Sequence, residues 1–144
     1  MKLRNLPTRL ATGAFVLHSG LGKWTGGPEQ AAGVHGMAAG AFPPLASIPA
    51  PTFLKGLSVG EVAIGATLLA PFVSNRRAGL ALTAFSGSLM ALYARTPALR
   101  EPGSIWPSQQ GIGVAKDVWM LGIGLGLLLE EARKAPEPVA APAS

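Results

Sequence analysis

Residues 78–94, AGLALTAFSGSLMALYA, form an uncharged stretch between Arg77 and Arg95. A helix on the surface of a soluble protein places polar side chains on its outward face at every third or fourth position. Apart from Tyr93 near its end, this stretch offers only the small hydroxyl groups of Thr83, Ser86 and Ser88. Its outward face is therefore suited to an apolar environment.

Residues 118–129, VWMLGIGLGLLL, are still more apolar, because the indole of Trp119 is their only polar group. Helices that are apolar all round need apolar surroundings, and 144 residues cannot wrap several such helices in protein. The alternative, a soluble protein in which these are core helices, would need polar outward faces that the sequence lacks. We therefore predict an integral membrane protein.

Four stretches approach the length of about 20 mostly apolar residues that is needed to cross about 30 Å of hydrocarbon. The predicted spans cover approximately residues 7–24, 53–73, 78–95 and 111–131. The predicted fold is all-α: an integral membrane four-helix bundle over residues 1–134. Residues 135–144, APEPVAAPAS, have a Pro/Ala composition for which we expect disorder.

The composition excludes several functions. Charged residues make up 13% of the chain, against about 25% in ordinary soluble domains. The absence of cysteine excludes disulfides, thiolate metal sites and cysteine nucleophiles. The two histidines show no metal-ligand spacing, and no Ser–His–Asp set or paired acid motif indicates catalysis, so we expect neither a metal nor intrinsic catalysis. The net charge of +5 comes from scattered Lys and Arg, which argues against a nucleic-acid partner.

The basic residues predict an orientation. With the N-terminus inside, seven Lys and Arg fall on the cytoplasmic side and five on the opposite side. The strongest signal is Arg76–Arg77, in a tight turn between the second and third predicted helices, so both termini are expected in the cytoplasm. The outer connections, residues 25–52 and 96–110, are long enough to cover a site, and the first is expected to hold a re-entrant or interfacial apolar segment.

Ionisable groups within the predicted spans gather in the outer half of the bundle. Glu61 is the most costly of them, because it lies eight residues into its helix, or about 12 Å at 1.5 Å per residue. The other candidate site residues are Lys23, Arg95, Lys116, Asp117 and His18.

One helical face carries Ser58, Glu61, Gly65 and Leu68. Small residues mark contacts between membrane helices, so this face should point into the bundle. There Lys23, Arg95 or Lys116 could neutralise Glu61.

This charged cluster allows two interpretations. It is either a pocket that opens outward beneath the two outer connections, or an internal ion-pair network that only fixes the packing of the helices. The ligand of such a pocket would be the head of a quinone or a small anion, and the excess of three bases and His18 over two acids favours the anion. A single histidine on a span is more often a packing residue than a ligand, so no metal is expected at His18.

Glycine spacing gives a packing prediction. Gly56–x–x–x–Gly60 and Gly122–x–x–x–Gly126 have the pattern that permits close approach of helices. Gly122, Gly124 and Gly126 do not indicate a nucleotide loop, because no strand precedes them.

Three segments together resemble the DoxX family of small bacterial membrane proteins: TRLATGAFVLHSGLGKW (8–24), FLKGLSVGEVAIGATLLAPFVSNRRAGLAL (53–82) and AKDVWMLGIGLGLLL (115–129). The shared features are an Arg that opens the first helix, Gly20–x–x–Lys23 that closes it, a Glu about two turns into the second helix, and a Lys–Asp pair that enters the fourth.

The resemblance implies a multi-pass four-helix bundle in the bacterial plasma (inner) membrane. It also implies an association with sulfur, thiol and oxidative-stress chemistry, because related proteins are membrane parts of thiosulfate:quinone oxidoreductases. Without cysteine, this chain should not perform thiol exchange itself. The expected role is an accessory or anchoring subunit that binds a quinone or small anion beside a soluble or membrane oxidoreductase partner. The alternative is a structural, scaffolding bundle. A permeation role is weaker, because four short helices would need an oligomer.

Overall fold

The computed structural model describes residues 3–132, which are helical and contain no β-strand. The α-helices are α1 (Leu6–Trp24), α2 (Pro28–Ala41), α3 (Ala50–Leu69), α4 (Asn75–Arg95), α5 (Ile112–Ala115) and α6 (Val118–Ala132). The 3₁₀ turns are η1 (Leu3–Asn5), η2 (Pro43–Ser47) and η3 (Pro97–Leu99). The predicted all-α class is confirmed, whereas the Pro/Ala segment 135–144 lies outside the described residues.

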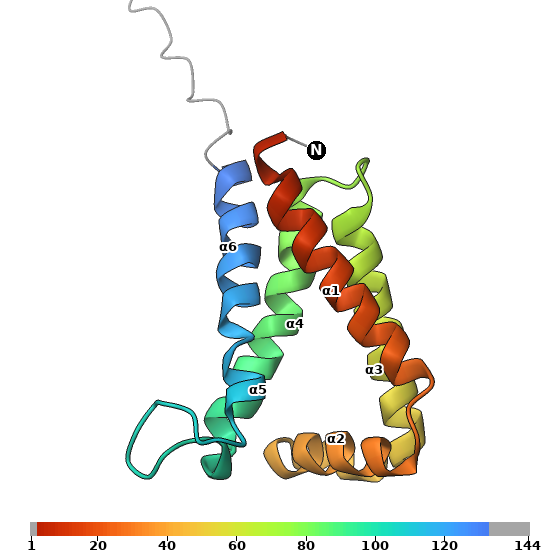
Figure 1. The fold of residues 1–144 in the computed structure, drawn as a ribbon, viewed down its shortest axis with the longest axis vertical. Helices are drawn as coiled ribbons and strands as arrows, with labels where there is room; N and C mark the ends of the chain where they lie inside the picture. The colour runs from red at the N-terminus through yellow and green to blue at the C-terminus, as the bar shows by residue number, and fades with distance from the viewer. Residues whose placement is uncertain (1–2, 133–144) are drawn as a thin grey trace, which may run out of the picture.

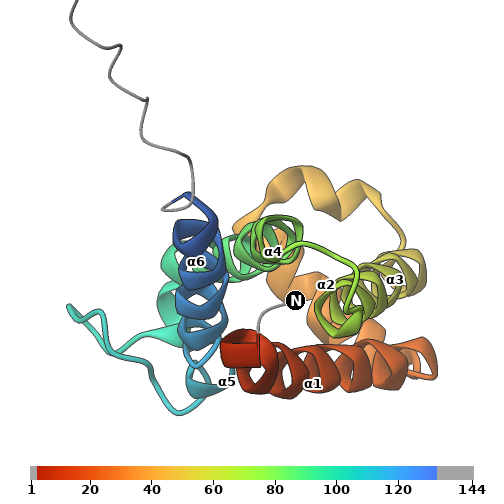
Figure 2. The ribbon, with the colours of Figure 1, turned by 90° about the horizontal axis from the view of Figure 1, so that it is seen from above.

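The long helices form two antiparallel pairs, in which α1 packs along α3 and α4 packs along α6 (Figure 1). Helix α2 lies across one end of these pairs, which we call the α2 end. The start of α1, the connection from α3 to α4 and the end of α6 lie together at the opposite end, which we call the network end. The outer connection that contains residues 96–110 reaches out sideways from the bundle (Figure 2).

Two prolines set the bounds of α3, which differ from the predicted 53–73. Pro51 lies in the first turn, where its missing N–H breaks no helical hydrogen bond, so the helix begins at Ala50. Pro71 disfavours helical backbone at the preceding residue, and Ala70 is accordingly extended (φ −68°, ψ 117°). The helix therefore ends at Leu69.

Helix α4 begins at Asn75 because Ser74 caps it, accepting a hydrogen bond from the backbone N–H of Arg77 (3.3 Å). The connection from α3 is as tight as predicted. Arg76 and Arg77, however, lie in the first turn of α4 and not in the connection itself.

The predicted continuous helix 111–131 is wrong at one point, because the helix is interrupted at Lys116–Asp117. The backbone N–H of Asp117 bonds to the carbonyl of Val114 (3.0 Å), a tighter turn than in an α-helix. Gly111 and Gly113 weaken the helical preference of this short first part. The interruption separates α5 from α6.

The outer connection 25–52 is mostly helical, with α2 and η2 as its main elements. Ala38 and Ala41 of α2 form a small core with Leu92 of α4 and Leu99, against which Phe42 and other partly buried side chains pack. This core fixes α2 across the end of the bundle.

Close approach between helices uses other glycines than those predicted. A Cβ on Gly20 would lie 2.8 Å from the backbone nitrogen of Val62, and one on Gly65 would lie 2.6 Å from that of Leu17, so α1 and α3 touch at both positions. Gly79 and Gly124 allow an equally close approach between α4 and α6. The prediction for Gly56, Gly60, Gly122 and Gly126 is wrong, because a Cβ on any of them would meet nothing within 4 Å.

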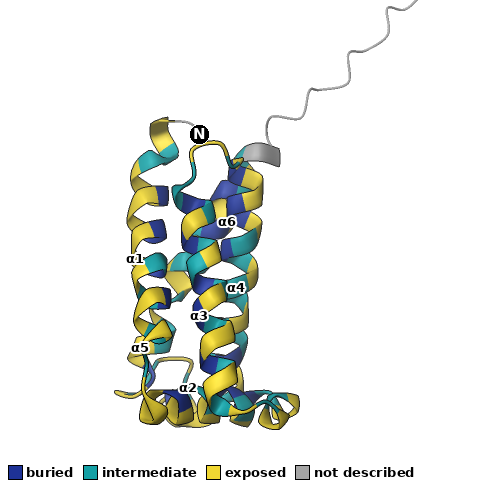
Figure 3. Cartoon of the chain, turned by 90° about the vertical axis from the view of Figure 1, so that its right-hand side faces the viewer, coloured by how far each residue is buried: buried dark blue, intermediate teal, exposed yellow. Residues whose placement is uncertain are grey.

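Two helical segments, Ala50–Leu69 and Ile112–Glu130, are long and apolar enough to cross a membrane by length and composition. Large apolar side chains are exposed on the long helices, as on Leu21, Val59, Leu80 and Leu129. Exposed positions occur along the length of these helices (Figure 3). The exposed helical surface is therefore rich in apolar groups.

Candidate functional site

A cavity of about 860 Å³ lies between the two helix pairs and is bordered by α2. Its walls are mainly apolar, and four of the five phenylalanines of the chain line it: Phe15, Phe42, Phe53 and Phe85. This volume lies within the range of about 300–1,000 Å³ that is typical of sites for small molecules.

The polar wall of the cavity is centred on an ion pair between α1 and α3. Lys23 Nζ lies 2.9 Å from Glu61 Oε2 and also donates to Ser19 Oγ at 2.7 Å. Ser19 and Lys23 are four residues apart, so they lie on one face of α1. Glu61 is only 5% exposed, and all of its predicted face on α3 is buried, which confirms that this face points inward. Of the three predicted neutralising partners, Lys23 takes the role.

The interruption between α5 and α6 brings two more charges to the cavity. Lys116 and Asp117 both line it, and Lys116 Nζ lies 5.8 Å from the centre of the Phe15 ring on α1. The cavity wall thus carries two bases and two acids, and its formal charge is zero.

Two of the six candidate residues do not line this cavity. Arg95 is the last residue of α4, and its guanidinium lies over the Phe42 ring at 4.7 Å. His18 is exposed on α1, because it is one position, or about 100°, away from the Ser19 face. The predicted excess of positive charge is therefore wrong for the cavity, which the structure shows to be balanced.

The two outer connections differ in their relation to the cavity. The first contributes lining residues from α2 and η2, including Gln30, Val34 and Met37. The second, residues 96–110, contributes none to the lining. The expectation that both connections cover a site is therefore wrong for the second one.

Sequence reasoning missed a second polar centre, which Arg9 forms at the network end. This side chain is fully buried and donates to four backbone carbonyls around the end of α3. The acceptors are those of Leu68 (2.8 Å), Val73 (2.9 Å), Thr67 (3.0 Å) and Ala70 (3.0 Å). Together with a bond to Asn75 Oδ1 (2.9 Å), these contacts match the five N–H donors of a guanidinium.

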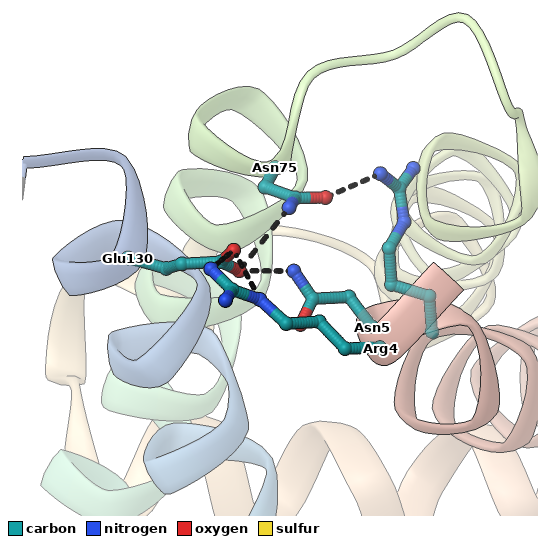
Figure 4. Close-up of polar contacts among 5 residues, drawn as sticks. Arg4, Asn5, Asn75 and Glu130 are labelled. Atoms are coloured by element: carbon teal, nitrogen blue, oxygen red, sulfur yellow. Dashed lines mark hydrogen bonds and ion pairs between the residues drawn. The ribbon is translucent and has the colours of Figure 1, made fainter. Parts of the chain in front are cut away.

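Asn75 connects Arg9 to the end of α6. Its Nδ2 donates to Glu130 Oε2 at 3.4 Å, and Glu130 also accepts from Asn5 and Arg4 (Figure 4). The position of Arg9 near the start of a span was the only signal in the sequence. Its acceptors lie 58 to 66 residues further along the chain, beyond the reach of a local pattern.

Within residues 3–132, no three His, Asp or Glu side chains are grouped so that they could hold a metal ion. Comparison of the chain with family models, with curated proteins and with solved structures gives no match.

Proposed function

We propose that this chain is a DoxX-like integral membrane protein whose cavity binds a lipid-soluble molecule with a polar head, of the quinone class. In this proposal α1, α3, α4 and the α5–α6 segment cross the bacterial plasma membrane. The network end faces the cytoplasm. The protein serves as an accessory or anchoring subunit of a membrane-associated redox system and has no catalytic activity of its own. The observation that carries the proposal is an apolar cavity with one charge-balanced polar wall.

The exposed surface supports the membrane placement. Leu80 and Leu129 are 62% and 65% exposed, and in water such side chains on neighbouring helices would form an unfavourable apolar surface. In a bilayer the same groups contact lipid, and helices satisfy most of their backbone hydrogen bonds internally. Arg76 and Arg77 at the network end support a cytoplasmic position for that end.

The charges of the cavity support a neutral ligand over a small anion. Lys23 already bonds to Glu61, and Lys116 adjoins Asp117, so a free anion would have to compete with a carboxylate for either base. A quinone head needs hydrogen bonds and no counter-charge, and its isoprenoid tail suits the phenylalanine-rich walls. We therefore favour the quinone over the anion.

Filling the cavity tests the binding proposal. Leu89 lines the cavity from α4, and Leu89→Trp should reduce binding of a ubiquinone with one isoprenoid unit at least tenfold, measured by equilibrium dialysis of the detergent-solubilised protein. Leu80→Trp, on the exposed face of the same helix, is the matched control and should bind like the wild type. Equal binding by both variants would place the ligand elsewhere, and competition by sulfate or thiosulfate would indicate the anion instead.

The absence of cysteine allows a direct test of the orientation. Phe72, at the network end, and Gln109, in the second outer connection but outside its apolar tip, are both exposed. On intact cells, a membrane-impermeant maleimide should label a Gln109→Cys variant and not a Phe72→Cys variant. The reverse pattern would invert the orientation, and labelling of neither in intact cells but both after lysis would contradict a spanning arrangement.

One observation favours the alternative of a structural bundle: Lys23 and Glu61 tie α1 to α3, and Ser58 Oγ adds a hydrogen bond to the carbonyl of Gly20 (2.7 Å). If these contacts only fix the packing, substitutions there will lower the melting temperature, and cavity-filling variants will leave redox activity in native membranes unchanged. Co-purification of an oxidoreductase and quinone from those membranes would favour the first proposal.

A further inference from the structure

The second outer connection folds back on itself as a hairpin. Arg100 and Pro107 form an antiparallel bridge, and the backbone N–H groups of Glu101 and Ser108 donate to the carbonyls of Trp106 (3.0 Å) and Leu99 (3.0 Å). We call residues 97–108 the side hairpin. These bonds fix the backbone on both sides of its tip.

Further contacts join the side hairpin to the bundle. Tyr93, on α4, donates its hydroxyl to the carbonyl of Ile105 (2.8 Å), and Arg100 Nη2 donates to the carbonyl of Ala94 (3.1 Å). Leu99 is 3% exposed and belongs to the core beneath α2. The hairpin is thus held in one position relative to the long helices.

This fixed hairpin presents two large apolar side chains outward. Ile105 is 78% exposed and Trp106 is 70% exposed. The hairpin extends sideways from the bundle at about the level of α2, as two perpendicular views show (Figures 1 and 2). The hairpin projects roughly at right angles to the long helices. If those helices cross a membrane, the hairpin therefore runs parallel to the membrane plane.

Trp24 indicates what lies at this level. It ends α1, at the α2 end of the bundle, and is 52% exposed. Trp119, which is 73% exposed, follows α5 and the turn at Lys116–Asp117 and so lies nearer the middle of the bundle (Figure 1). Tryptophan is enriched at membrane interfaces, where its ring contacts acyl chains and its N–H remains hydrated.

We infer that the side hairpin is an interfacial anchor that inserts Ile105 and Trp106 among the lipid headgroups, on the same side of the membrane as Trp24. The inference rests on the membrane placement proposed above and adds a defined lipid-binding surface to it. A lipid layer fits this surface better than a protein partner, because the exposed pair lies at the end of the bundle where Trp24 is also exposed on a separate helix.

Depth-dependent fluorescence quenching tests this inference. Three double Trp→Phe variants each keep one tryptophan and are reconstituted into phosphatidylcholine vesicles with bromine at acyl carbons 6 and 7 or at carbons 11 and 12. We expect Trp106 to be quenched more by the shallow bromines than by the deep ones, with the same ratio as Trp24.

Other results would overturn the inference in distinguishable ways. If Trp106 is unquenched while Trp24 and Trp119 are quenched, the hairpin faces water or a protein and the membrane proposal stands. Stronger quenching of Trp106 by the deep bromines would contradict the interfacial depth. If all three tryptophans are unquenched and the protein does not float with the vesicles, both the anchor and the membrane proposal fail.

Discussion

Buried charged side chains have different surroundings at the two ends of the bundle. At the network end, Arg9 is 0% exposed and each of its donors meets an oxygen, so its charge serves to close the end of α3. At the α2 end, Lys23 and Glu61 satisfy each other on the wall of an apolar cavity of about 860 Å³. A buried charge thus marks a candidate binding site only where unfilled space lies beside it.

This contrast reverses the order of importance that the sequence suggests. Depth along the helix makes Glu61 the most costly charge, whereas Arg9 lies near the end of a predicted span, where a long side chain could reach headgroups. In the structure Arg9 is the more buried of the two and makes more hydrogen bonds.

The largest effect is expected from Arg9→Met. It removes the Arg9 donors from four backbone carbonyls and from Asn75 Oδ1. The carbonyl of Ala70 still accepts from the N–H of Val73 (3.2 Å), and each buried acceptor that is left unpaired costs about 1–3 kcal/mol. We expect loss of most of the folded protein, measured as the monodisperse fraction in size-exclusion chromatography in detergent. Arg9→Lys, which keeps the charge but not the fork of five donors, should recover only part of it. A wild-type elution profile for Arg9→Met would show that the network end does not depend on this side chain.

A smaller effect on stability is expected from Glu61→Met. It leaves the Lys23 ammonium without its counter-charge in a mainly apolar cavity, and removal of one partner from a buried pair typically costs about 3–5 kcal/mol. The double variant Lys23→Met/Glu61→Met removes both charges and should recover the lost melting temperature.

The same double variant separates stability from binding at the α2 end. If the pair holds the polar head of a ligand, quinone binding should fall at least tenfold although the protein is folded. Binding that is unchanged in a folded double variant would contradict a ligand role for the pair and favour the structural bundle.

The smallest effect is expected from Arg4→Ala at the network end. Its side chain is 63% exposed in its ion pair with Glu130, and exposed pairs contribute about 0–1 kcal/mol. Glu130 keeps its bonds to Asn5 and Asn75. Thermal melts should therefore shift little, and a loss comparable to that of Arg9→Met would mean that the network acts as one unit.

Local pattern was sufficient for several features of the fold. The hydropathy of the chain predicts its long helices, and the period of 3.6 residues places Ser58, Glu61, Gly65 and Leu68 on one buried face. The predicted bounds of the helices were less accurate. Pro51 and Pro71 shift the bounds of α3 by a few residues, and the turn at Asp117 interrupts the last helix.

The candidate site could be predicted only in part. Lys23, Glu61, Lys116 and Asp117 meet at the cavity, but His18 and Arg95 do not. The level of each residue along the bundle axis follows from its position along a helix. The direction in which each side chain points depends on how that helix is rotated about its own axis relative to its neighbours. This rotation cannot be predicted from the amino-acid composition of the helix.

By itself, the sequence determined that this chain is helical, poor in charge, free of cysteine and apolar on surfaces that water would disfavour. Only the tertiary structure decided that Lys23 pairs with Glu61, that Gly20 and Gly65 make the contact of α1 with α3, and that Arg9 closes the end of α3. The physical reason is the range of the interactions. Hydropathy and helical period act over one or two turns, whereas these contacts join residues that are 38 to 66 positions apart.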